Sequence, residues 1–182
     1  MSSVSQTPVK ARGGFARWFA VSMAVVVVIL GLSLNGAWPH ILRIAARARL
    51  HAPDMALWDS LPLAMKLHVA GALSALVLGG ALMTVRKGRL FHRTAGWVWA
   101  SLVSVVAGSS LFITSLNHGR WSLLHLFTGW TLIILPLAVI WAKRHNVARH
   151  RRAMMGLFYG GFAINLFIAF IPGRTMWTML FG

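Results

Sequence analysis

Cysteine is absent from the 182-residue chain, and acidic residues are nearly absent, since Asp54 and Asp59 are the only two. Without thiols the chain forms no disulfides, thiolate metal sites or iron–sulfur clusters. Without acids in its apolar segments, a carboxylate-bridged di-iron centre is excluded. A nucleophile paired with a base and a glycine-rich phosphate loop are also missing, so the sequence does not indicate hydrolysis or phosphoryl transfer.

Apolar residues are abundant instead. They make up 58% of the chain, and the mean hydropathy is +0.71. Charged residues account for 11%, whereas a soluble domain has roughly a quarter. These values predict an integral membrane protein. The net charge of +16 comes from Lys and Arg between the apolar runs, where they face lipid headgroups. We therefore expect a lipid bilayer partner and no nucleic acid.

Five apolar runs have the roughly 20 residues that a helix needs to cross a bilayer. They cover residues 18–38, 61–85, 94–116, 123–142 and 153–171. The first is long for a signal peptide and has no clean cleavage site after it, which favours a retained span. Between the first two runs, apolar residues alternate with Arg43, Arg47 and Arg49 at helical spacing, which is typical of a helix on the membrane surface. The final residues, RTMWTMLFG, are too few to span.

The predicted fold is therefore an all-α integral membrane protein with five transmembrane helices. Residues 1–60 hold a cytoplasmic leader, the first span and the surface amphipathic helix, and residues 61–182 form a four-helix core with a short tail. With the N-terminus in the cytoplasm, 12 of the 18 Lys and Arg residues lie on the inner side, in agreement with the positive-inside rule. We predict a multi-pass protein of the cytoplasmic membrane with a cytoplasmic N-terminus.

The histidines suggest a function because four of them form two pairs at matched depth. His68 and His125 lie just inside the outer ends of the second and fourth spans, and His92 and His150 lie at the inner ends of the third and fifth. Two facing imidazoles are the axial ligands of a six-coordinate haem. The sequence thus predicts one or two b-type haems held by bis-His sites. Arg93, Arg151 and Arg152 are candidates to pair with the propionates of the inner haem.

Small residues follow each of these histidines and would leave room for a flat ring. They are Gly71, Ala72, Ala75 and Gly79 after His68, Gly96 and Ala100 after His92, Gly129 after His125, and Gly156 and Gly160 after His150. The same residues also permit close helix packing without any ligand. A histidine beside an arginine at a helix end is also tolerated at a membrane interface. His40, His51, His118 and His145 are expected to be surface residues.

The two pairs are too far apart to form one four-histidine zinc site, because they lie roughly 27 Å apart at 1.5 Å per residue. The same separation is long for direct electron transfer between two haems. A version with one haem on the outer pair, His68 and His125, avoids this difficulty.

Residues 61–172 resemble the bacterial membrane proteins grouped as domain of unknown function 2306. The resemblance rests on KLHVAGALSALVLGG, on HRTAGWVW after a short basic loop, and on ARHRRAMM at the start of the last span. The chain departs from the family at Gly156 and Leu157, where a polar Arg-Ser pair is expected, and at Gly79-Gly80, where Gly-Pro is expected. The resemblance implies a bacterial inner membrane and no established activity. The arrangement of His68, His125, His92 and His150 is also similar to that of the cytochrome b561 type of di-haem protein.

Two classes of function follow. The first is a b-type cytochrome that carries electrons across or within the membrane, as an electron-transfer component of an oxidoreductase with a redox partner or a quinone. The alternative is a cofactor-free small subunit that packs into or assembles a larger membrane complex. A transporter is less favoured, because broken helices and polar midplane sites are few.

Overall fold

The computed structural model describes residues 35–113 and 124–182, with isolated positions 17, 20, 23, 24, 27, 28 and 31. The chain divides into two compact units, Met1–Trp38 and Pro39–Gly182. In the first unit the isolated positions have helical backbone, and the short helix η1 covers Asn35–Ala37. Most of the first predicted span, residues 18–38, lies outside the described residues.

The described residues of the second unit form helices joined by turns and loops, with no strand among them, which confirms the all-α class. Its elements in chain order are α2 (Trp38–Ala46), α3 (Met55–Ser60), α4 (Leu63–Thr84), α5 (Leu90–Ser110), α6 (Leu124–Lys143), α7 (Val147–Met155), the π-helix η3 (Gly156–Ala163), α8 (Ile164–Ala169) and α9 (Thr175–Phe181). The elements α7, η3 and α8 run on from one another without a break.

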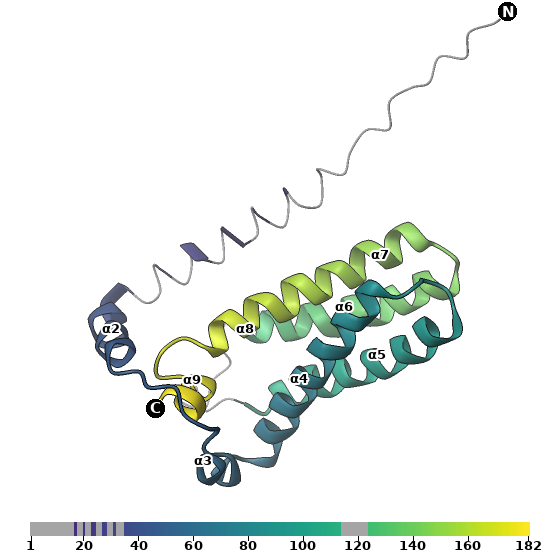
Figure 1. Ribbon diagram of the computed structural model, residues 1–182. Helices are drawn as coiled ribbons and strands as arrows, with labels where there is room; N and C mark the ends of the chain where they lie inside the picture. Colours follow the sequence, from purple (N-terminus) through teal and green to yellow (C-terminus); the bar gives the residue numbers. More distant parts are fainter. Residues whose placement is uncertain are drawn as a thin grey trace, which may run out of the picture. The chain divides into compact units, whose positions relative to one another are not determined.

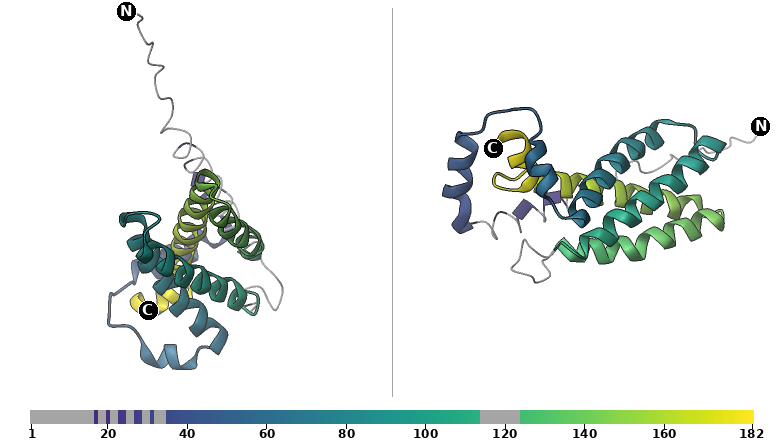
Figure 2. Two further views of the ribbon diagram at one scale, coloured as in Figure 1. Left: turned by 90° about the vertical axis from the view of Figure 1, so that its right-hand side faces the viewer. Right: turned by 90° about the horizontal axis from the view of Figure 1, so that it is seen from below.

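Four long helices form a bundle in this unit: α4, α5, α6 and the continuous helix α7–η3–α8 (Figure 1). The connections at residues 85–89 and 144–146 lie at one end of the bundle, which we call the loop end. The short helices α2, α3 and α9 lie at the opposite end, the cap end (Figures 1 and 2). The loop end corresponds to the inner side in the predicted topology.

Three helices in the described part of the chain are long and apolar enough to cross a membrane: Leu63–Thr84, His125–Lys143 and Val147–Ala169. They correspond to the second, fourth and fifth predicted spans. The third, predicted at residues 94–116, appears as α5, which begins at Leu90 and ends at Ser110. Its Ser, Thr, Gly and Trp residues lower its hydropathy, so its role as a span stays a prediction, and five spans are not confirmed.

The core lies between α4, α5 and the π-helix. Trp99 is 3% exposed, and its indole Nε1–H donates to the backbone oxygen of Ala75 at 2.9 Å. Gly79 is needed beside it, because a Cβ at this position would lie 2.5 Å from Phe158 Cε2 and 2.7 Å from Trp99 Nε1. Gly71 serves the same purpose, since a Cβ there would lie 3.0 Å from Val106 Cγ2. These two glycines therefore bring α4 close to its neighbours.

The cap end is built from the segment predicted to be a surface helix and from the tail. In α2, Ile41 is buried while Arg43 is exposed, as the amphipathic pattern predicts. The backbone N–H groups of His51 and Asp54 donate to Leu180 and Met179 oxygens at 3.0 and 3.1 Å, which fastens α3 to α9. The tail forms a seven-residue helix, too short to span.

Candidate functional site

Burial separates the histidines into two groups. His68, His92, His125 and His150 are each half-buried. His40, His51 and His145 are exposed, as predicted for surface residues, and His118 lies outside the described residues. The four histidines that the sequence singled out as a set are thus also set apart by their surroundings.

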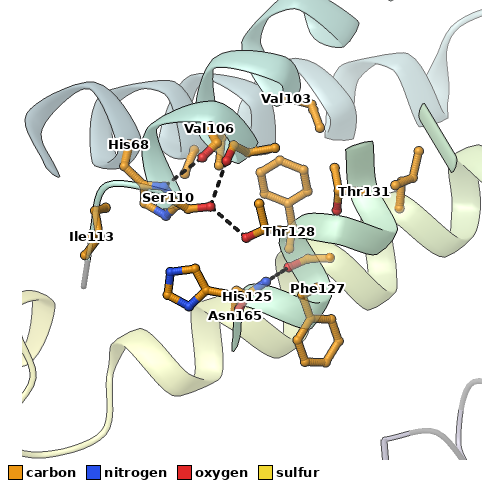
Figure 3. Close-up of a pocket in the computed structure, with 15 residues that line it drawn as sticks. His68, Val103, Val106, Ser110, Ile113, His125, Phe127, Thr128, Thr131 and Asn165 are labelled. Atoms are coloured by element: carbon orange, nitrogen blue, oxygen red, sulfur yellow. Dashed lines mark hydrogen bonds between the residues drawn. The ribbon is translucent and has the colours of Figure 1, made fainter. Parts of the chain in front are cut away.

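The outer pair lines one cavity. His68 on α4 and His125 on α6 both border a space of about 170 Å³ between the four long helices, near the cap end. Figure 3 shows both imidazole rings turned toward this space. The fifteen lining residues include six polar ones, contributed by α4, α5, α6 and α8, namely His68, Ser110, His125, Thr128, Thr131 and Asn165. The structure therefore brings together the outer pair that sequence spacing predicted.

The ring of His68 is held in one orientation. Its Nδ1 lies 3.0 Å from the backbone oxygen of Val106, which can only accept a hydrogen bond. Nδ1 therefore carries the proton and donates, and in the neutral imidazole Nε2 keeps a free electron pair. An imidazole with this bond pattern is prepared to bind a metal or to accept a hydrogen bond through Nε2.

Hydroxyl and amide groups complete the polar lining of the cavity. Ser110 and Thr128 share a hydrogen bond of 2.7 Å between their hydroxyl oxygens. The Asn165 side-chain amide donates to the backbone oxygen of Gly161, one turn earlier in the same helix. That bond uses one of its two amide hydrogens. Sequence spacing alone did not place Asn165 beside the histidines.

The π-helix forms one wall of the cavity. Leu157, Gly161 and Phe162 all belong to it and all line the space. In a π-helix the hydrogen bonds run from residue i to i+5, and such segments are frequent at functional sites. A Cβ at Gly161 would have no atom within 4 Å, so this glycine faces open space. No feature in the sequence analysis predicted the π-helix, and the glycine-rich stretch GLFYGGFA is its only visible sign.

The inner pair lies at the loop end. His92 is in the first turn of α5, and His150 is in α7. Nδ1 of His150 lies 3.0 Å from the backbone oxygen of Ala138 on α6 and therefore donates to it, which leaves Nε2 free as in His68. Nδ1 of His92 is buried and has no hydrogen-bond partner.

The surroundings of His92 disfavour the charged form of its imidazole. His92 precedes the apolar part of α5, and its burial lowers the pKa of its imidazole below the usual value. Charges on Lys87 and His150 lower that pKa further. A neutral imidazole is the form that binds a metal. The second predicted pair thus lies at one end of the bundle, on α5 and α7.

Cations surround this inner pair, and no acid lies near them in the sequence. Both acids of the chain, Asp54 and Asp59, border or belong to α3 at the cap end. The exposed cations at the loop end include Arg86, Lys87, Arg89, Arg93, Lys143, Arg144, Arg149, Arg151 and Arg152. Among them, Lys143 places its ammonium 5.5 Å from the centre of the Trp97 ring. Arg93 and Arg151 therefore remain available to anionic groups.

The small residues have divided roles. Neighbouring side chains occupy the space where a Cβ of Gly71 or Gly79 would lie, so the packing interpretation is confirmed for these two glycines. A Cβ added at Gly156 would lie 3.7 Å from the Trp130 ring, and one added at Gly160 would lie 3.9 Å from it. A Cβ at Gly96 or Gly129 would meet nothing within 4 Å. Close packing inside the bundle therefore does not require glycine at these two positions.

No group of three or more His, Asp or Glu side chains suited to a metal ion is found among the described residues. Comparisons of this chain with family models, curated proteins and solved structures found no match. The resemblances on which the sequence analysis drew stay predictions.

Proposed function

We propose that this protein is a b-type haem-binding membrane protein that carries electrons across or within the membrane through bis-His coordination. One observation carries the proposal: each histidine pair contains one ring fixed by an Nδ1–H bond to a backbone oxygen, from His68 to Val106 and from His150 to Ala138. This pattern sets the tautomer and presents Nε2 to a ligand, as the outer hydrogen bonds of metal-bound histidines do.

The inner pair has features that suit a haem. The buried Nδ1 of His92 lacks a partner, and a Cβ at Gly96, one turn further along α5, would meet nothing within 4 Å. The exposed guanidinium groups of Arg93, Arg151 and Arg152 lie at the same end of the bundle and suit carboxylates such as the propionates. When bound, haem supplies a centre that takes up and gives back one electron. The chain holds it through His92 and His150 and neutralises its carboxylates.

The outer pair offers the same ligand chemistry, but the cavity beside it is small for a haem. Its cavity measures about 170 Å³, close to the engineered cavity of about 150 Å³ that takes up benzene. A porphyrin contains four pyrrole rings and needs several times that volume. A second haem on His68 and His125 would require the helices to separate, so the proposal assigns haem to the inner pair first. This reverses the one-haem version that sequence spacing alone favoured.

The membrane arrangement belongs to the same proposal. The loop end carries the dense group of cations and the cap end carries both acids, which supports a cytoplasmic loop end by the positive-inside rule. In this arrangement α5 and residues 18–38 are also spans, and the N-terminus is cytoplasmic. The bacterial inner membrane follows from the family resemblance. A redox partner or a quinone would exchange electrons with the haem, as part of an oxidoreductase.

The test is the visible spectrum of the full chain purified in detergent from haem-replete cells, first oxidised and then reduced with dithionite, with haem quantified per chain. We expect the Soret and α-bands of a low-spin b-type haem. His92→Ala and His150→Ala should each lower the haem content at least tenfold. His145→Ala is the matched control, since His145 is exposed in the neighbouring turn, and it should retain haem.

His150→Ala also breaks the bond to Ala138, so misfolding needs a separate check. In His92→Gly, added imidazole should restore the α-band, because a free imidazole can take the place of the missing ring. A colourless wild-type protein that elutes as a folded species would refute the cytochrome. It would support the cofactor-free subunit.

A further inference from the structure

The cavity beside His68 continues into a groove that reaches the outside of the bundle. The groove measures about 90 Å³ and shares His68, Ala72, Phe162 and Asn165 with the cavity. Its other lining residues are apolar, and among them Leu73 and Leu166 are 46% and 38% exposed. In a bilayer these exposed side chains face lipid. A molecule dissolved in the membrane can therefore enter from the side, between α4 and α8.

The chemistry of the two spaces differs. The cavity has the volume of a single substituted ring and receives polar groups from all four helices. The groove is smaller than a ring requires and is almost wholly apolar, so it suits a hydrocarbon chain. Together they match an amphipathic molecule with one polar ring and an apolar tail.

The polar groups narrow the class of the ring. Nε2 of His68 is a hydrogen-bond acceptor, because Nδ1 donates to Val106. The Ser110 hydroxyl donates to the backbone oxygen of Ala107 at 2.8 Å, so the Thr128 hydroxyl supplies the proton of their mutual bond, and the pair offers a ligand only acceptor oxygens. The amide of Asn165 has a second hydrogen beyond the one given to Gly161. A ring with oxygen atoms on opposite sides, either carbonyls or hydroxyls, can use both kinds of group.

Fatty acids and phospholipids are less suited to the cavity. The lining residues of the cavity and the groove include neither Lys nor Arg. A carboxylate or phosphate placed there would lack a counter-ion, and burying an unpaired charge is very unfavourable. A neutral headgroup is required.

We propose that the cavity lined by His68, Ser110, Thr128 and Asn165 binds the headgroup of a lipid-soluble quinone or quinol, with its isoprenoid tail in the adjoining groove. The quinol hydroxyl donates to Nε2 of His68, and the oxygen on the far side of the ring accepts from the Asn165 amide. The role of this ligand as an electron partner rests on the proposed function, whereas its binding does not.

The experiment uses the full chain in phosphatidylcholine nanodiscs, equilibrated with decylubiquinone. After unbound quinone is removed, the quinone that remains is extracted and quantified per chain, with empty nanodiscs subtracted. The wild-type protein should saturate near one quinone per chain. An excess of decanol, which has the same chain length and no ring, should not displace it.

Gly161→Leu is the variant designed to fill the cavity, because Gly161 lines it and a Cβ there has free space. It should reduce quinone binding at least tenfold, as should Asn165→Leu. Gly80→Leu is the matched control: its Cβ also meets nothing within 4 Å, and Gly80 lines neither space. It should bind like the wild type.

Haem content is measured on the same samples and separates the two proposals. His92→Ala should lose haem and keep quinone, while Gly161→Leu should do the reverse. Wild-type binding in Gly161→Leu, or displacement by decanol as effective as by quinone, overturns the quinone site. Loss of haem in His68→Ala with unchanged quinone binding also overturns it, because the outer histidines would then hold a haem. A colourless wild type that still binds quinone overturns only the cytochrome.

Discussion

Gly79→Ala tests whether the close approach of α4 to its neighbours holds the bundle together. The added methyl group would lie 2.5 and 2.7 Å from two carbons of the Phe158 ring and 2.7 Å from Trp99 Nε1. Carbon atoms in favourable contact are roughly 3.5–4.0 Å apart, so both rings would have to move by about 1 Å. Trp99 has little freedom to do so, because it is 3% exposed and bonded to Ala75.

The size of the effect follows from two costs and one gain. Overpacking a well-packed core costs about 1–3 kcal/mol, and weakening the Trp99–Ala75 hydrogen bond costs about 1 kcal/mol. Alanine favours a helix over glycine by about 1 kcal/mol. Gly79→Ala should therefore lower the free energy of unfolding by about 1–3 kcal/mol.

Gly80→Ala provides the control, because it gains the same helix propensity and its Cβ meets nothing within 4 Å. It should leave the stability unchanged or raise it by up to about 1 kcal/mol. The assay is unfolding in mixed micelles of increasing dodecyl sulfate content, followed by circular dichroism and tryptophan fluorescence. Equal free energies of unfolding for the two variants would show that the core does not restrict this position.

Two further predictions concern single interactions of the bundle. The Lys87 ammonium donates to the backbone oxygens of Leu82, Met83 and Val85 at 3.0, 2.7 and 2.9 Å, and a cation at a helix C-terminus contributes about 0.3–1 kcal/mol. Lys87→Met should lower the free energy of unfolding by about that amount. Arg86→Met removes the same charge from the same loop and should lower the free energy of unfolding by less. Equal losses in the two variants would contradict the role of the hydrogen bonds to the carbonyl oxygens. The hydroxyl bond of 2.7 Å between Ser110 and Thr128 should give a coupling energy of about 0.6 kcal/mol, and at most about 1.7, in a cycle of Ser110→Ala and Thr128→Val. Strict additivity in the same unfolding assay would mean that the bond contributes nothing.

Hydrophobic patterning predicted the bounds of a long helix well where a proline and a basic loop flank the apolar run. The second span was predicted at residues 61–85, and α4 covers Leu63–Thr84. It follows Pro62, which lacks an amide hydrogen and is tolerated at a helix start, and it ends at a basic loop. The last helix was predicted less well, since residue 153 was taken as its start and it begins at Val147.

The reason for that error is a local hydrogen bond. The Asn146 side chain accepts from the backbone N–H of Arg149 at 3.2 Å and so caps the helix. Hydropathy excludes the cationic residues 149–152 from a span, although a helix readily continues through them beyond the membrane core. His150 therefore lies on a formed helix, where its ring reaches the Ala138 oxygen.

The candidate site was predicted in part, for a similar reason. The spacing of the histidines correctly placed two at each end of the bundle, because helical rise converts sequence distance into depth. It did not reveal the Val106 and Ala138 oxygens that orient His68 and His150, since these belong to neighbouring helices. It left open whether Gly71 and Gly79 serve helix packing or make room for a ligand; they serve packing, and the open space lies beside Gly161.

The difference between the two histidine pairs arises from tertiary packing rather than from residue type. In both pairs one imidazole donates through Nδ1 to a backbone oxygen, so both are prepared to use Nε2. At the cap end the π-helix and its glycines leave a cavity with the volume of one ring, lined by hydroxyl and amide groups. At the loop end exposed arginines, Arg93 and Arg151, directly follow the two histidines in the sequence. An imidazole with a free Nε2 is thus present at both ends of the bundle. At the cap end it lies beside a cavity suited to a neutral ring, and at the loop end it lies among residues suited to anionic groups. This difference is expected if the two ends hold different redox molecules.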